Sequence, residues 1–246
     1  MKRLLWLLLV PTLILAMALP GCKSETTTIR IATDATWAPF ESVNDQTKQI
    51  EGFDIDLMNA IAERSGLKIE FVNVAFDPLL AGMAQGTYDA AISSITITAE
   101  RAKDMLFSNP YFNAGQIITV RTDNTTITGK STLTGKVGAQ LGTTGAIEVG
   151  KIAGVTLKTY DDIGFAFQDL MNKQIDAVVC DTPVAFGYVG KNATKIKTVG
   201  TAFTDENYGI AVAKGKTDLL AKINSGLAKA KADGIIEQLT TKWLKS

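Results

Sequence analysis

One segment combines side chains and backbone groups that suit a carboxylate ligand. Residues 93–101 read Ser-Ser-Ile-Thr-Ile-Thr-Ala-Glu-Arg and follow an apolar run that is typical of a strand. They place the hydroxyls of Ser94 and Thr96 and the guanidinium of Arg101 where a helix is expected to begin, near Thr98. Arginine can bind both oxygens of a carboxylate, and the N–H groups at a helix start have no partners inside the helix. The alternative is that Thr98 only caps the helix and that Arg101 is solvated.

Other candidate side chains come directly after expected strands. They are Asp34, Trp37, Gln140, Thr144 and Asp181. Because ligands of α/β sheets bind beyond the carboxyl ends of the strands, these side chains could converge on one site. The turn Gln-Leu-Gly-Thr-Thr-Gly that begins at Gln140 lacks the lysine of a phosphate-binding loop and the spacing of a dinucleotide fingerprint.

Each of these residues also has a structural alternative. Trp37 could be a core aromatic, Asp34 a turn cap, and Asp181 the cap of the helix that follows it. Cys180 could line a pocket, although burial as a small structural thiol is favoured. Taken together, the set offers an arginine for a carboxylate, an aspartate for an ammonium group and an aromatic wall. A zwitterionic amino acid needs such a set, since a buried charge is costly unless it is paired.

The elements that must position these side chains alternate along the chain, which predicts an α/β fold with mainly parallel sheets. Strands are expected over residues 28–33, 68–74, 88–94, 116–121, 136–139, 155–160, 175–179, 195–199 and 207–213. Helices are expected over 52–65, 216–233 and 235–244, and from starts near 77, 98, 144, 162 and 182. The polar stretch 123–131 could lie near a boundary between lobes.

The composition excludes several classes of protein. The chain has no histidine and two cysteines, Cys22 and Cys180. This excludes Ser-His-Asp and Cys-His catalysis, and we expect neither a metal site nor a cofactor. The chain has 25 basic and 25 acidic residues, so loss of Lys2 and Arg3 with a signal peptide would leave a net charge of about −2. That balance is not typical of a nucleic-acid-binding protein.

The N-terminus is typical of a secreted lipoprotein. A basic start, Met-Lys-Arg, precedes an apolar run that ends at Leu19, so residues 1–21 are expected to be a signal peptide, with a permanent membrane span as the alternative. The sequence Leu-Pro-Gly-Cys22 resembles a bacterial lipoprotein processing site, in which the proline is unusual. Processing there would leave a lipid on Cys22 and a tether over residues 22–27. We therefore expect a membrane-anchored, extracytoplasmic protein.

A series of motifs runs in order through residues 28–246. They are Ala32-Thr-Asp-Ala-Thr-Trp-Ala-Pro-Phe-Glu41, Gly52-Phe-Asp-Ile-Asp-Leu57, Phe76-Asp-Pro-Leu-Leu80, Ile92-Ser-Ser-Ile-Thr-Ile-Thr-Ala-Glu-Arg101, Phe107-Ser-Asn-Pro-Tyr111, Gly142-Thr-Thr-Gly145, Asp181 and Tyr208-Gly-Ile-Ala211. In this order the motifs resemble the bacterial extracellular solute-binding proteins of the polar amino-acid family, family 3, which are receptors of ABC importers.

The resemblance implies a periplasmic-binding-protein-like type II fold, in which two α/β lobes are joined by a two-strand hinge and bind ligand in the cleft. Residues 28–110 and 210–246 would form one lobe and residues 116–204 the other, with the hinge near 111–115 and 205–209. Members of the family deliver a polar L-amino acid to a membrane permease and its ATPase. The resemblance therefore implies a monomeric binding protein and not an enzyme.

The resemblance also implies a set of ligand-binding side chains: Asp34, Trp37, Phe76, Ser94, Thr96, Arg101, Gln140, Thr144 and Asp181. Arg101 and the two threonines would bind the α-carboxylate, and Asp181 beside the serine would bind the α-ammonium group. The two aromatic rings would flank the ligand side chain, whose polar end would meet Asp34 and Gln140. Arginine, lysine or glutamine is favoured over glutamate, because no cation is evident at that end.

Two other functions remain open. Some relatives with this fold are cyclohexadienyl or arogenate dehydratases, which need a proton donor in the pocket, and Asp181 is the candidate for that role. A sensory module that binds an amino acid would have the same cleft.

Overall fold

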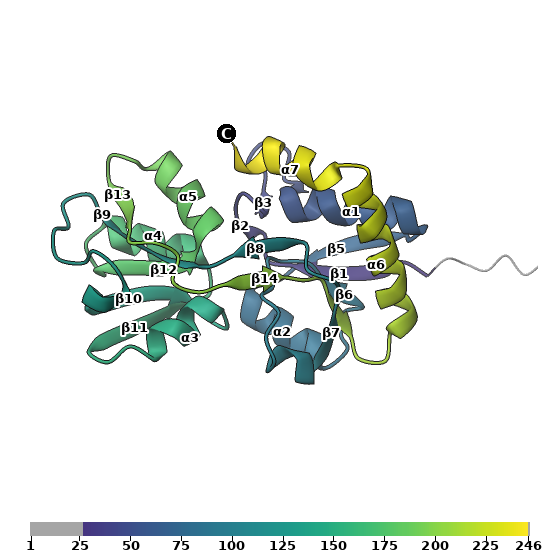
Figure 1. Ribbon diagram of the computed structural model, residues 1–246, viewed down its shortest axis with the longest axis horizontal. Coiled ribbons are helices and arrows are strands. Elements are labelled where there is room, and N and C mark those ends of the chain that lie inside the picture. Colours follow the sequence, from purple (N-terminus) through teal and green to yellow (C-terminus); the bar gives the residue numbers. More distant parts are fainter. Residues whose placement is uncertain (1–26, 246) are drawn as a thin grey trace, which may run out of the picture.

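The computed structural model describes residues 27–245, which form two α/β lobes side by side (Figure 1). Each lobe is built on a five-stranded sheet, with strand orders β5-β1-β6-β15-β7 and β11-β10-β12-β9-β13. The predicted two-lobe α/β class is therefore confirmed. The predicted signal peptide and the lipid attachment at Cys22 lie outside the described residues.

The first lobe carries a small second sheet and most of the helices. Its strands are β1 (Ile29–Thr33), β2 (Thr36–Trp37), β3 (Glu41–Val43), β4 (Ile50–Glu51), β5 (Ile69–Asn73), β6 (Ala90–Ala91), β7 (Met105–Phe107) and β15 (Ala211–Ala213). Its helices are α1 (Phe53–Ser65), α2 (Phe76–Ala84), the 3-10 turn η1 (Arg101–Lys103), α6 (Thr217–Ala232) and α7 (Ile235–Leu244).

The second lobe is formed by one continuous part of the chain. Its strands are β9 (Gln116–Arg121), β10 (Gly135–Gln140), β11 (Val155–Tyr160), β12 (Ala177–Asp181) and β13 (Ile196–Val199). Its helices are the 3-10 turn η2 (Lys130–Thr132), α3 (Thr144–Gly150), α4 (Ile163–Met171) and α5 (Thr182–Lys191). Between the lobes, β8 (Phe112–Ala114) pairs antiparallel with β14 (Glu206–Tyr208) (Figure 1).

Each five-stranded sheet has four strands that run in the same direction and one that runs against them, so the prediction of mainly parallel sheets holds for strand direction but missed the antiparallel strands β15 and β9. In the first lobe β1 runs parallel to β5 and β6, whereas β15 runs antiparallel to β6 and β7. In the second lobe β10 runs parallel to β11 and β12, whereas β9 runs antiparallel to β12 and β13. The strands β9 and β15 follow β8 and β14 directly, so the chain enters each sheet from the connecting strands without the helical crossover that a parallel strand requires.

Two local predictions around the arginine also need correction. The predicted helix near Thr98 is only the 3-10 turn Arg101–Lys103, because the chain must return as β7 from Met105. The predicted strand over residues 88–94 shortens to Ala90–Ala91, since the chain turns at Ser94, whose φ is 47°.

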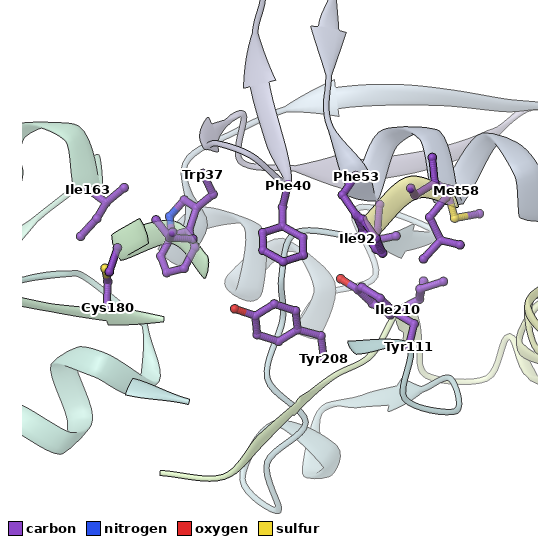
Figure 2. Packing of buried hydrophobic residues seen from close by; sticks show 14 of the residues in the cluster. Trp37, Phe40, Phe53, Met58, Ile92, Tyr111, Ile163, Cys180, Tyr208 and Ile210 are labelled. Carbon is purple, nitrogen blue, oxygen red and sulfur yellow. The ribbon is translucent and has the colours of Figure 1, made fainter. Parts of the chain in front are cut away.

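An aromatic cluster joins the first lobe to the connecting strands (Figure 2). The Phe40 ring lies 5.5 Å from the ring of Tyr208 and 5.4 Å from that of Phe53, in edge-to-face arrangements. Tyr111 stacks on Phe53 at 6.4 Å. These contacts combine apolar burial with favourable ring geometry. Cys180 belongs to the same core and is 2% exposed, which agrees with the structural alternative for this thiol.

Helices α1 and α6 pack closely at Gly226. A Cβ atom at this position would lie 2.6 Å from the carbonyl oxygen of Ile61 and 2.9 Å from its Cγ2 atom. Real Cβ atoms do not approach backbone oxygens so closely, so any larger residue must move the helices apart.

We expect Gly226→Ala to lower the free energy of unfolding by ~1–3 kcal/mol in urea denaturation, because the new methyl group overpacks the helix contact. Gly190→Ala in α5 is the matched control, since a Cβ there has no neighbour within 4 Å. The control should be neutral or stabilising by up to ~1 kcal/mol, owing to the better helix propensity of alanine. Equal losses in both variants would contradict the packing argument.

Candidate functional site

A small cavity lies between the lobes. Its walls are Trp37, Phe76, Ser93, Ser94, Thr96, Arg101, Thr143, Thr144 and Asp181. The structure thus brings together seven of the nine predicted ligand-binding residues, and it adds Ser93 and Thr143, which the sequence did not single out. The cavity encloses about 10 Å³, room for roughly one water molecule. An amino acid would therefore require the walls to part.

Arg101 crosses from the first lobe to the second. Its Nη1 donates to the carbonyl oxygen of Thr96 at 2.8 Å, and its Nη2 donates to that of Gly142 at 2.9 Å. The guanidinium carbon also lies 5.3 Å from the centre of the Phe76 ring. The side chain is therefore held in the cleft, and the alternative of a solvated arginine is wrong. Burial lowers the pKa of Arg101 to about 10, opposed by the nearby charges of Asp181 and Glu206, so the group stays protonated at neutral pH.

Asp181 faces the same cavity from the second lobe. It occupies the N-cap position of α5, but its side chain makes no capping hydrogen bond, which removes the structural alternative. Its Oδ1 is buried without a hydrogen-bond partner among the described residues, as is the Oγ of Ser94. Burial raises the pKa of Asp181 to about 7, the charge of Glu206 raises it further, and Arg101 opposes both effects. An ammonium group, which has three donors and no acceptor, would satisfy these oxygens.

Glu206 in β14 ties the two lobes to the connecting strands. Its Oε2 accepts hydrogen bonds from the hydroxyls of Thr96 in the first lobe and Thr144 in the second, both at 2.7 Å. A hydroxyl has one hydrogen, so neither threonine can donate to a ligand carboxylate in this arrangement. The only sequence signal for Glu206 was its place in the predicted hinge.

Asp34 and Gln140 do not line the cavity. The Nε2 of Gln140 donates to Oδ2 of Asp34 at 2.6 Å, and the indole N–H of Trp37 donates to the Oε1 of Gln140. The Trp37 ring is buried and also stacks on Phe76, with centroids 6.3 Å apart, so it is both a core aromatic and a cavity wall. Burial raises the pKa of Asp34 to about 6. Contact of Asp34 and Gln140 with a ligand stays a prediction.

A larger groove of about 500 Å³ lies elsewhere, between α5 and α7. Its walls include Phe186 and Trp243, and its charged residues, Lys191 and Lys245, are exposed. It therefore lacks the pair of opposite charges that lines the small cavity. Within residues 27–245, no group of three or more acidic or cysteine side chains could hold a metal ion. No helix in this part of the chain is both long and apolar enough to cross a membrane.

Comparison with known proteins assigns the family. Residues 29–246 match the model of the bacterial extracellular solute-binding proteins, family 3. The chain belongs to this family. The family prediction from the sequence is thus confirmed, and membership indicates an extracytoplasmic location. The family and the relatives below are binding proteins and not enzymes.

The relatives of this family 3 protein bind amino acids. The ABC transporter arginine-binding protein 1 of Escherichia coli K12 is 34% identical over 222 residues, 87% of this chain and 90% of the relative. An ancestral arginine-binding protein bound to arginine is 43% identical, with a TM-score of 0.84 over 88% of this chain and 97% of that one. An ancestral arginine-binding protein bound to glutamine is also 43% identical, with a TM-score of 0.84 over 89% of this chain and 98% of that one.

The raised pKa of Asp181 predicts how stability depends on pH. In the fold this pKa is about 7, above its ordinary 3.8, so the folded state holds the proton more tightly than the unfolded state. The contribution of Asp181 to stability is then greatest in acid and is lost as the pH rises through about 7.

We expect Asp181→Asn, which mimics the protonated side chain, to raise the free energy of unfolding of the ligand-free protein by ~1–3 kcal/mol above neutral pH. The gain should disappear in acid, where Asp181 is already neutral. Urea denaturation across the pH range measures both effects. If the free energy of unfolding of Asp181→Asn equals that of the parent at every pH, Asp181 does not have the raised pKa.

Proposed function

We propose that this family 3 solute-binding protein captures a polar L-amino acid between its lobes and delivers it to the permease of an ABC importer. One observation carries the proposal: Arg101 of one lobe and Asp181 of the other, with opposite charges, line the same buried cavity. The zwitterionic part of an amino acid has the complementary pair of charges. The amino-acid ligands of the relatives support the same conclusion.

The ligand α-carboxylate would bind Arg101. The guanidinium has five N–H donors, and only two of them are used on the carbonyl oxygens of Thr96 and Gly142. Since the threonine hydroxyls donate to Glu206, further hydrogen bonds to the carboxylate would come from backbone N–H groups at Thr96 and Thr144. The α-ammonium group would bind Asp181 Oδ1 and Ser94 Oγ, whose hydrogen-bonding capacity is free.

The ligand side chain would lie between the rings of Trp37 and Phe76. Beyond Trp37, the amide N–H of Gln140 donates a hydrogen bond to the carboxylate of Asp34. A cationic ligand side chain that reaches this end could donate to Asp34 in place of the amide. A neutral amide could exchange hydrogen bonds with Gln140. We therefore propose arginine, lysine or glutamine as the ligand, since aromatic faces and a carboxylate both favour such groups.

Binding would couple to lobe closure. We propose lobes of residues 28–110 with 210–246 and of residues 116–204, with hinges near 111–115 and 205–209. Opening must break the contacts of Trp37 with Gln140 and of Arg101 with Gly142. A ligand that contacts both lobes favours the closed form by its differential affinity, and the permease would recognise that form. The mature protein would be a monomer anchored through a lipid on Cys22.

A thermal-shift screen of the twenty amino acids on the mature chain tests the ligand class. A true ligand at about 100 times its Kd should stabilise the protein by roughly 2.7 kcal/mol. Arg101→Ala and Asp181→Asn should each abolish the shift, because each leaves one ligand charge unpaired in a buried site. If both variants keep the ligand-induced thermal shift, these two residues do not form the binding site.

Arg30→Ala and Asp169→Asn are the matched controls, because they remove the same kinds of charge at partly exposed positions that do not line the cavity. Both should retain the parent shift. Product formed from prephenate or arogenate, without any amino-acid shift, would support a dehydratase in place of a receptor.

Ligand affinity should fall as the pH drops below about 7, because Asp181 must lose its proton to pair with the ammonium group. Near neutral pH, binding should therefore release a proton from this residue. Calorimetry in two buffers with different ionisation enthalpies measures that release. Affinity that rises in acid, or binding without proton release at neutral pH, would contradict this role for Asp181.

A further inference from the structure

Two fully buried carboxyl groups lie directly behind the cavity wall. Glu41 belongs to β3 and Asp54 to the first turn of α1, and both side chains are 0% exposed. Asp54 Oδ2 accepts hydrogen bonds from the backbone N–H of Ser94 at 2.7 Å and the hydroxyl of Tyr111 at 2.8 Å. Glu41 Oε1 accepts one from the hydroxyl of Ser93 at 3.0 Å. The two carboxyls thus hold two consecutive residues of the cavity wall.

The other oxygens of the two groups, Oε2 of Glu41 and Oδ1 of Asp54, are buried and have no other partner among the described residues. No cation within this part of the chain acts on either carboxyl. The titratable neighbours of the pair are Asp34, Tyr111 and Tyr208. Two ionised carboxylates without a cation repel each other in a buried site, and a shared proton removes that repulsion.

We propose that Glu41 stays protonated at neutral pH and donates a hydrogen bond to the carboxylate of Asp54. This carboxyl pair would position Ser94 to accept a hydrogen bond from the ligand ammonium group. The ligand part of this inference rests on the proposed function; the shared proton does not. Asp54 is the ionised member because it accepts two hydrogen bonds from other groups, whereas Glu41 accepts one. Burial raises the pKa of both groups, to about 7 for Asp54, and the charge of Asp54 raises that of Glu41 further.

Ser94 needs such support. Its φ of 47° lies in the left-handed region, which is unfavourable for a residue with a Cβ atom. The hydrogen bond from its N–H to Asp54 holds this conformation and leaves the serine Oγ without a protein partner at the cavity. Loss of the shared proton would place two negative charges behind this turn. The turn and the cavity wall would then loosen together.

The test compares two isosteric amides, Glu41→Gln and Asp54→Asn. Glutamine at 41 can donate its N–H to Asp54 permanently, so the amino-acid Kd at neutral pH should stay within about twofold of the parent. At alkaline pH the affinity of the parent for the amino acid should fall more than that of Glu41→Gln. Loss of the proton from the ligand ammonium group affects both proteins equally, so it cancels in this comparison. Asp54→Asn replaces an ionised acceptor of two hydrogen bonds, so its Kd should rise about tenfold at neutral pH.

Infrared spectroscopy of the ligand-free protein tests the shared proton without any ligand. At neutral pH the parent should show the carbonyl band of a protonated carboxylic acid, to which the partly protonated Asp181 also contributes. The difference between the spectra of the parent and Glu41→Gln cancels the Asp181 contribution and should show the loss of one such band. Thermal stability of the parent should decline at alkaline pH more than that of Glu41→Gln, because the folded state holds this proton above its unfolded pKa.

Unchanged infrared bands in Glu41→Gln, or an alkaline loss equal to that of the parent, would overturn the proposal. A rise in Kd for Glu41→Gln as large as that for Asp54→Asn would overturn it too. Glu41→Gln alone decides the matter if Asp54→Asn does not fold. If no amino acid binds the parent, the proposed function fails, and the infrared and stability results still decide the shared proton.

Discussion

The opposite charges of the half-buried Arg101 and the buried Asp181, from different lobes, are the constraint on which the rest of the cleft depends. A buried charge is costly unless another charge or several hydrogen bonds compensate it. Arg101 donates hydrogen bonds to two backbone carbonyl oxygens, and one carboxylate oxygen of Asp181 has no hydrogen-bond partner among the described residues. The cleft is therefore incompletely satisfied as it stands, and a zwitterion would complete both halves. The zwitterion would gain affinity because the fold leaves these charges and hydrogen-bonding groups unsatisfied in the absence of ligand.

The same contacts link the cleft to the connecting strands. Glu206 holds hydroxyls of both lobes, and Tyr111, just before β8, holds Asp54 behind the cavity wall. The connecting strands, which would bend in the proposed opening, thus begin or end at groups that shape the site. Rotation of the lobes and the position of the ligand-binding groups cannot change independently.

The sequence predicted the parts of this arrangement that follow from local pattern. Asp181 ends a strand and Arg101 lies in the segment that follows one, on the side where α/β sheets bind ligands, and their opposite charges indicate a zwitterion. It did not predict Glu206 or the carboxyl pair, because their roles depend on hydrogen bonds between residues far apart in the chain, such as Thr96 and Glu206. It also missed the short strands β2 to β4, since two or three residues carry no periodic pattern.

Burial raises the pKa of both Asp181 and Glu41, yet the proposed ligand contact and the proposed carboxyl pair require opposite protonation states from them. Asp181 would have to ionise to pair with an ammonium group, and the cationic Arg101 favours this against the charge of Glu206. Glu41 must stay protonated, and its charged neighbours, Asp54 and Asp34, are both acidic. A cation acts on Asp181 alongside an acidic neighbour, whereas only acidic charges act on Glu41, and this difference separates two carboxyls that burial alone would treat alike. A receptor built in this way would bind its ligand best at a pH above the pKa of Asp181 and below that of Glu41, without using a histidine.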